Sequence, residues 1–334
     1  MAKVKQSLTT IAVALGVSKA TVSWVLSGQG DSKGISPATQ KKVKDYAEAH
    51  NYRPNMLARS LSMGVSKSVG LLISSLSDPF YTGIAKAVLS AAESKGYSVI
   101  IGASESDFEK EDELVTTFSY RRVDGIIITP TGSRGWEDSF RVQGGKAVFI
   151  DRGLPDCDYP SVCVDNAQSS CTLVRHLIGK GCRKIAIMIT AHNLSNMQAR
   201  HDGYLEALSE AGIESDAGLV CEVPPAATIP EINSALDRLF EKVPDVDGIF
   251  FTSHVLVLPT YVHLAMRGFK IDGGARWACF HTQPEFGLLL PEMSIALMPL
   301  DKLGSAAMET LLSQMDEKAE GMQSAILNCE MLLH

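Results

Sequence analysis

Residues 19 to 24 offer side chains that suit contact with nucleic acid. Lysine, threonine and serine can bind phosphates or base edges, and tryptophan can pack on a thymine methyl group. Within residues 9–26, TTIAVALGVSKATVSWVL, the apolar positions fit two short helices that meet at a bend. Gly16 suits the bend, Ser18 can cap the second helix, and the pattern predicts a helix-turn-helix that reads the major groove. The side chains expected to face outward are Lys19, Ala20, Thr21, Ser23 and Trp24.

A corner of an all-helical domain that never touches DNA would show the same pattern, and charge separates the two interpretations. Ten basic residues against three acidic ones give residues 1–67 a formal net charge of +7. Because the whole chain carries −7, the remaining residues carry −14. A basic head on an acidic body favours phosphate binding, although a solvated charged face could also produce such a bias.

The head needs a third helix and a loop before it. Residues 28–34, GQGDSKG, contain G-x-G but follow a helix instead of a strand, so the nucleotide-binding fingerprint fails. We interpret them as a flexible loop. Ser36 and Pro37 can open a third helix, and Val43 with Ala47 can close a three-helix head of residues 1–53.

Two motifs in this region resemble the lactose-repressor (LacI) family of bacterial transcription regulators. The first, T-I-A-x-x-x-G-V-S-x-x-T-V-S, occupies residues 10–23. The second, N-Y-x-P-N followed by A-R-S-L, occupies residues 51–55 and 58–61. The resemblance continues more weakly through the body and implies that the chain binds DNA as a dimer. One departure lies at Trp24, where the family commonly has an arginine that can bond to guanine, so the operator sequence stays open.

Residues 54–67 form the expected hinge helix and linker. Asn55 can cap a helix over residues 56–63, and Gly64 can end it. Eight residues make a helix of roughly 12 Å, too short to persist alone in water, so we expect it to fold on binding. The resemblance implies that paired hinge helices lie in the minor groove with Leu61 wedged into a base step. We expect Asn55 and Arg59 to contact DNA as well; a plain spacer is the alternative.

Beyond residue 68, strand-like and helical stretches alternate, which predicts parallel, doubly wound α/β folding. Strands are expected at 69–73, 99–101, 126–128, 148–150, 185–189, 219–221, 249–251 and 277–280. The fold class is therefore a small all-α head plus an α/β core of two parallel-sheet subdomains, similar to periplasmic binding proteins. We expect crossovers near residues 165–166 and 290–294. The expected subdomains are about 68–165 with 295–320, and about 166–292 with 322–334.

A cleft between two such subdomains is the expected site for a small molecule. By resemblance, Phe80 and Tyr81 stack on the effector, and Arg200, in an R-x-x-G-Y pattern, binds ligand oxygens. The alternative for Phe80 and Tyr81 is packing in the core, and the alternative for Arg200 is a solvated charge. Asn196, Arg152, His254 and His281 are also expected to face the cleft.

Two histidines stand where the family usually has acidic residues. Ser253-His254 replaces Asn-Asp, and His281 replaces an aspartate. Their loss, with Arg200 and Arg152 retained, would make the cleft cationic, especially if a histidine were protonated. We therefore hypothesise an anionic effector, a sugar acid or sugar phosphate. The alternative, which stays open, is a drifted pocket that binds a neutral sugar poorly or binds nothing at all.

Other classes of protein find little support in the sequence. No P-loop, nucleophile-elbow or H-E-x-x-H motif occurs, so we expect no catalytic residues. The eight histidines lack ligand spacing, and the seven cysteines are scattered, so we expect no metal, cofactor or disulfide. A sugar-binding module of the periplasmic type would have no use for a basic head. We therefore expect a cytoplasmic, homodimeric repressor controlled by a sugar-like effector.

Overall fold

The computed structural model describes residues 7–52, 64–132, 135–142, 144–155, 157–190, 194–224, 227–316 and 323–334. The chain divides into two compact units, Met1–Ser66 and Lys67–His334. In the described residues, no single helix is long and apolar enough to cross a membrane.

The first unit contains a three-helix head. Its helices are α1 (Leu8–Leu15), α2 (Lys19–Leu26) and α3 (Pro37–Ala49). Gly16 ends α1 in the left-handed region at φ 64°, and α2 is bent from α1 by 111°, within the range of helix-turn-helix motifs. Ser18 and Ser36 cap α2 and α3 by accepting hydrogen bonds from backbone N–H groups. The buried apolar side chains that hold the head together are Ile11, Ala12, Val22, Val25 and Val43.

The second unit is built on two six-stranded sheets. The first has the order β11-β5-β4-β3-β1-β2 and the second β12-β10-β9-β8-β6-β7, so the chain repeats one winding twice. Every described pairing is parallel except that of β12 with β10. The first sheet consists of β1 (Ser68–Ile73), β2 (Ser98–Ala103), β3 (Gly125–Ile128), β4 (Ala147–Ile150), β5 (Ser161–Val164) and β11 (Ala325–Leu327). The second consists of β6 (Ile185–Thr190), β7 (Val220–Val223), β8 (Gly248–Phe251), β9 (Trp277–Phe280), β10 (Ser294–Leu297) and β12 (Glu330–Leu332).

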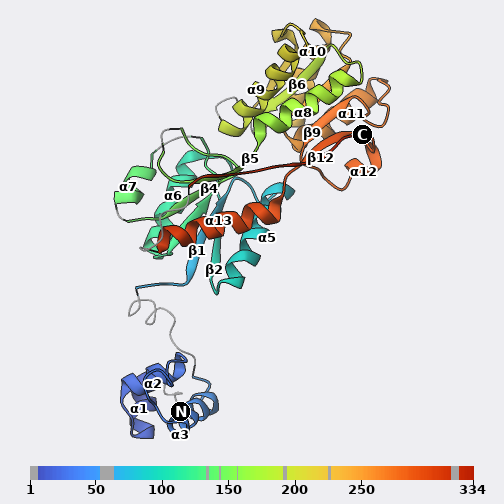
Figure 1. Ribbon diagram of the computed structural model, residues 1–334. Coiled ribbons are helices and arrows are strands. Elements are labelled where there is room, and N and C mark those ends of the chain that lie inside the picture. The colour runs from blue at the N-terminus through green and yellow to red at the C-terminus, as the bar shows by residue number, and fades with distance from the viewer. Residues whose placement is uncertain are drawn as a thin grey trace. The chain divides into compact units, whose positions relative to one another are not determined.

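Helices cover both sheets, and the inner strands are buried throughout, as parallel strands require. Each sheet and the helices that cover it form one lobe of the second unit. The helices of the first lobe, on the first sheet, are α5 (Pro79–Ser94), α6 (Phe108–Tyr120), α7 (Glu137–Val142) and α13 (Leu300–Met315). Those of the second lobe are α8 (Asn166–Gly179), α9 (Ser195–Glu210), α10 (Ile229–Lys242), α11 (Val257–Met266) and α12 (Phe286–Leu289). Figure 1 shows α13, in red, beside α5 and the first sheet, although the two helices lie more than 200 residues apart in the chain.

Each strand expected from the sequence overlaps a strand of the structure, but the subdomain boundaries differ at the C-terminal end. β10 was expected with the first lobe, yet it pairs with β9 and β12 in the second sheet. The crossing expected at residues 290–294 therefore falls after β10, at residues 298–299. The last segment also divides, because β11 pairs with β5 of the first sheet. The lobes are thus linked at three places, after β5, β10 and β11.

Candidate functional site

The side chains expected to read DNA all lie on α2. Lys19, Ala20 and Trp24 are exposed there, and Thr21 and Ser23 are half-buried. The Ser18 hydroxyl accepts a hydrogen bond from the Thr21 backbone N–H at 2.9 Å, which fixes the start of the helix. Asn55, Arg59 and Leu61, expected on the hinge helix, lie outside the described residues.

A cleft lies between the lobes at the carboxyl ends of the strands, where open α/β sheets bind ligands. Six residues predicted for the site line it: Phe80, Tyr81, Asn196, Arg200, His254 and His281. Six others that line it were not predicted: Asp78, Asp151, Met197, Ser253, Phe280 and Met298. Asp78 directly precedes the predicted Phe80-Tyr81 region, and Asp151 directly follows a predicted strand, so position along the chain was a signal for both.

Arg152 was expected to face the cleft, but it lies behind the cleft wall. Its side chain is buried, and its guanidinium donates to the Pro130 carbonyl at 2.6 Å and to the Ser74 hydroxyl at 2.5 Å. Its Nη1 lies 3.8 Å from Oδ2 of Asp151. Arg152 therefore supports Asp151 from behind and does not line the cleft.

Arg200 is fixed in the cleft wall by contacts from the second lobe. Its Nε donates to Oδ1 of Asn166 at 2.8 Å and its Nη1 to the Thr252 carbonyl at 2.5 Å. The guanidinium carbon lies 3.9 Å from the centroid of the Phe280 ring, a cation–π contact. Burial lowers the pKa of Arg200, but a guanidinium keeps its charge in proteins. A rigid cation thus faces the cleft.

Among the described residues, two hydrogen bonds between side chains that line the cleft join the lobes. Asn196 Nδ2 donates to Oδ2 of Asp151 at 3.1 Å. On the other side, His254 Nε2 lies 3.0 Å from Oδ1 of Asp78, and both side chains are largely buried. The same Asp78 oxygen accepts the Phe80 backbone N–H at 2.8 Å and so caps α5. Burial alone would raise the pKa of Asp78, but its bonds to His254 and Phe80 lower it overall.

His281 is packed among aromatic rings and has no partner for one nitrogen. Its ring meets Phe80 edge-on, with centroids 5.3 Å apart, and lies 5.7 Å from the ring of His254. Among the described residues no group bonds to its buried Nδ1. Burial, with the nearby His254, lowers the pKa of His281 to about 4, so it is neutral at pH 7. His281 also adopts φ 64°, as Asp151 adopts φ 74° at the matching position after β4.

The expected excess of positive charge in the cleft is not found. The carboxylates of Asp78 and Asp151 face the single guanidinium of Arg200, and His281 is neutral. With Arg152 behind Asp151, the charges balance. The cavity measures about 40 Å³, room for a few waters and far below the roughly 300–1,000 Å³ of small-molecule pockets. A ligand must therefore displace side chains or separate the lobes to enter.

One group of side chains outside the cleft has the donors of a cation site. Cys171, Glu206 and Glu210 bring three ligand atoms within 4.8 Å of one another. Arg175 already occupies this cluster, with Nη2 at 2.6 Å from Glu210 and 3.3 Å from the sulfur of Cys171. Its guanidinium supplies the positive charge that the carboxylates need.

Family profiles account for both units of the chain. The profile described as "Bacterial regulatory proteins, lacI family" matches residues 7–55. The profile described as "Periplasmic binding proteins and sugar binding domain of LacI family" matches residues 66–333. The chain belongs to the LacI family. It is a ligand-responsive transcription regulator with a DNA-binding head.

Relatives of this LacI-family chain cover most of its length. The ribose operon repressor of Halalkalibacterium halodurans is 29% identical over 303 residues, which span 90% of this chain and 88% of the relative. The regulator RegA of Clostridium saccharobutylicum is 26% identical and spans 98% and 97% of the two chains. Among solved structures, the CelR–cellobiose complex aligns with TM-score 0.71 at 23% identity, covering 98% of each chain. Pseudomonas putida Cra with fructose 1-phosphate aligns with TM-score 0.70 at 22% identity, covering 80% of this chain and 98% of that one. These curated relatives are transcription regulators.

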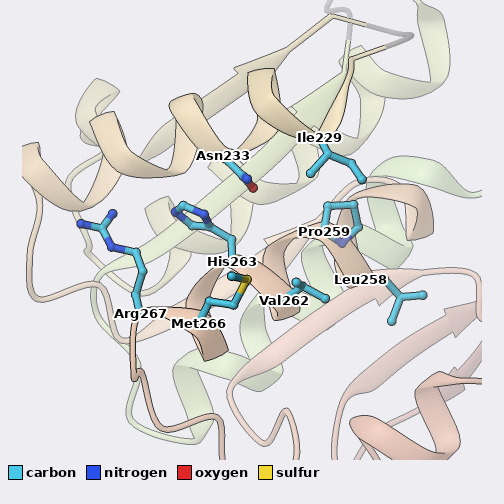
Figure 2. A pocket seen from close by; sticks show the side chains of 8 residues that line it. All are labelled: Ile229, Asn233, Leu258, Pro259, Val262, His263, Met266 and Arg267. Carbon is cyan, nitrogen blue, oxygen red and sulfur yellow. The ribbon is translucent and has the colours of Figure 1, made fainter.

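The LacI-family core also carries an apolar groove between α10 and α11, away from the cleft (Figure 2). The groove measures about 500 Å³, and Figure 2 shows side chains from both helices facing it. Met266 is 85% exposed, Ile229 62% and Val262 51%. The remaining lining residues are Asn233, Leu258, Pro259, His263 and Arg267.

Proposed function

We propose that this chain is a cytoplasmic, homodimeric repressor that binds a palindromic operator under control of a sugar-like effector. The observation that carries the proposal is one chain that joins a basic head, with an exposed α2 face, to a two-lobed cleft with a fixed arginine. The alternative, a sugar-binding module without regulatory DNA binding, leaves the helix-turn-helix head unexplained.

Dimer formation is supported by the demands of operator recognition and by the groove. One short helix reads too few bases to select a site in a genome, whereas a two-fold dimer reads two half-sites. The exposed apolar side chains of α10 and α11 offer a surface that a second copy of the chain would cover. The occupant we propose for this groove is therefore the same face of a second copy.

DNA binding is tested with operator fragments recovered from genomic DNA by the purified protein. Lys19→Ala should weaken operator binding because it removes a cation from the reading helix. Leu61→Ala should weaken it by removing the hinge wedge that the family resemblance implies. Unchanged affinity of both variants in a salt-controlled gel-shift assay would contradict this mode of binding.

The effector we propose is a small polyhydroxylated sugar. The candidate classes are a neutral sugar, a sugar acid and a sugar phosphate. Two carboxylates and a guanidinium in one cleft provide acceptors and donors for hydroxyl groups. With the buried Arg152 beside Asp151 counted as well, two negative and two positive charges balance, which favours a neutral ligand over an anion. Two structural neighbours hold cellobiose and fructose 1-phosphate, which represent the neutral and anionic classes.

Calorimetric titration separates these classes. Ribose and cellobiose serve as neutral probes, and gluconate and fructose 1-phosphate as anionic ones. Heat of binding with a neutral sugar, lost in Arg200→Met, supports the proposal. Tight binding of an anionic probe alone would contradict the neutral class while leaving DNA regulation intact.

Regulation would act through the relative pose of the lobes. Because the cleft holds only about 40 Å³ of free space, an effector must displace side chains or change how the lobes meet, and we propose that it changes how the lobes meet. Three chain crossings join the lobes, so a change in their pose can bias the order of the linker that joins the head to the first lobe. The effector and the operator are then coupled through one equilibrium.

A further inference from the structure

Trp24 stands on the reading face of α2 and has a cation beside its ring. The indole is 37% exposed and lies one helical turn beyond Ala20, so the two share a face. Lys33, from the loop after α2, places Nζ 5.5 Å from the centroid of the Trp24 ring. This distance lies within the range of cation–π contacts.

The loop that carries Lys33 is held at both ends, which differs from the flexible loop expected from its sequence. The Gln29 backbone N–H donates to the Trp24 carbonyl at 2.8 Å, and the Lys33 N–H donates to the Gln29 carbonyl at 3.1 Å. From α3, Gln40 Nε2 donates to Asp31 Oδ1 at 2.8 Å and to the Ile35 carbonyl at 2.9 Å. Lys33 is thus held next to Trp24 by a loop that is hydrogen-bonded to α2 and α3.

Gly30 leaves the space in which Gln40 makes these hydrogen bonds. A Cβ at residue 30 would lie 2.4 Å from Cδ of Gln40, so any larger side chain would push Gln40 away. Three residues of this loop therefore have structural roles in the head. Gly30 leaves room for Gln40, Asp31 accepts a hydrogen bond from Gln40, and Lys33 places its ammonium group beside Trp24 of α2.

We propose that Trp24 and Lys33 form one composite reader of a thymine–guanine step in the operator. The indole offers an apolar face for the thymine methyl group, and the ammonium offers donors for guanine O6 and N7. Tryptophan alone cannot supply those donors to guanine in bidentate form. The cation–π contact keeps the ammonium next to the indole, so the two groups meet neighbouring bases together. This inference rests on the proposed DNA-binding function and makes it more specific.

The test is selection of half-sites from a library of random duplexes by the full-length protein and its variants. The variants are Lys33→Gln, Lys33→Arg, Trp24→Ala and the double variant. Lys41→Gln is the matched control, because Lys41 is an exposed lysine of the same head, paired at 3.7 Å with Asp45. Thermal unfolding confirms that each variant is folded.

We expect the wild type and Lys41→Gln to select the same half-site. Lys33→Gln should relax one guanine position by about 10- to 100-fold in relative affinity, and Lys33→Arg should retain it. Trp24→Ala should relax the neighbouring thymine, and the double variant should lose less than the sum of both because the groups act together.

The outcomes separate this inference from the proposed function. A wild-type protein that selects no half-site contradicts both. A wild type that selects an operator, with Lys33→Gln selecting the same bases at the same affinity, overturns the inference alone. A uniform loss over all sequences, with a salt slope reduced by about one, would mean that Lys33 binds a phosphate and would overturn base reading.

Discussion

His281, which lines the cleft, has two unusual features. Its Nδ1 is buried without a hydrogen-bond partner among the described residues, and its backbone is held at φ 64°. Non-glycine residues in this region cost energy and gather at ligand sites. This nitrogen, on a ring that packs against Phe80 and His254, is a group that the hydroxyl of an entering ligand could satisfy.

The lowered pKa of His281 predicts a loss of stability in mild acid. Between pH 6.5 and 4 the unfolded chain protonates this histidine, whereas the folded chain, with a pKa of about 4, does not. Unfolding then takes up a proton, so the free energy of unfolding falls as pH falls, by at most about 3 kcal/mol. His281→Asn, which tolerates positive φ, should show a smaller decrease.

Urea unfolding at several pH values between 7 and 4.5 measures this difference. Carboxylates shared by the wild type and His281→Asn cancel in the comparison. Equal slopes of stability against pH for the two proteins would show that His281 is not held neutral by the fold.

Part of the site was predictable residue by residue. Arg200 begins the R-x-x-G-Y pattern, Asn196 lies one helical turn before it, and both line the cleft. The charge of the cleft was not predictable, because it depends on Asp78 and Asp151, whose neighbours come from the opposite lobe. Arg152 was expected in the cleft from its place after a predicted strand, but its guanidinium bonds to the Pro130 carbonyl and the Ser74 hydroxyl instead.

At the scale of elements, α9 is positioned by its close approach to α8. A Cβ at Gly203 would lie 2.1 Å from the carbonyl oxygen of Ala167 and 2.8 Å from Cβ of Ser170. Only glycine lets the two helices meet here. Since Asn196 and Arg200 lie on α9, this contact also sets where their side chains enter the cleft.

Gly203→Ala should destabilise the core and weaken effector binding together. The added methyl meets backbone that cannot move aside, and overpacking of this kind costs about 1–3 kcal/mol or more. Gly179→Ala, at the end of α8 with nothing within 4 Å, is the control and should change stability by no more than about 1 kcal/mol. Chemical denaturation and calorimetry measure both; equal behaviour of the two variants would contradict the role of Gly203.

Most strands in the alternating part of the chain were predictable, including the four-residue β3, β4, β8 and β9, whereas the last three strands were not. Periodic apolar positions predicted strands such as β1 and β6, six residues each and largely buried. β10, β11 and β12 have three or four residues each, and β11 pairs with β5, more than 150 residues earlier in the chain. Their sheet membership depends on the path of the chain between the lobes, which local sequence does not encode.

The whole molecule depends on how its two lobes meet. The pair His254–Asp78 closes one side of the cleft and Asn196–Asp151 the other. Both pairs are hydrogen-bonded away from water, where loss of one partner leaves the other unsatisfied. We therefore expect these contacts to keep the lobes together when no effector is bound.

His254→Ala should loosen the cleft and free the start of α5, because Asp78 would lose its partner across the lobes. Hydrogen exchange followed by mass spectrometry should be faster in peptides covering residues 78–84 and 252–257. His176→Ala, a histidine of α8 that bonds to the His334 carbonyl, serves as the control. Unchanged exchange in both peptides would mean that other contacts hold the lobes.

A charged side chain introduced into the apolar groove should weaken the dimer. Met266→Asp places a carboxylate in the face proposed to be covered by a second copy, and the dimer dissociation constant should rise at least about 10-fold. Tyr120→Asp is the matched control, since Tyr120 on α6 is also 85% exposed. Sedimentation equilibrium measures both; a dimer unaffected by Met266→Asp would place the interface elsewhere.

We expect a two-fold dimer of this chain to bind DNA through α2 and to change its affinity for DNA when a ligand enters the cleft. DNase footprinting of recovered genomic fragments at physiological ionic strength tests it most directly. We predict a protected palindrome whose occupancy changes when a sugar that binds the cleft is added, with no such change in Arg200→Met. Protection without dyad symmetry would contradict binding as a two-fold dimer, and no protection at all would contradict operator binding itself.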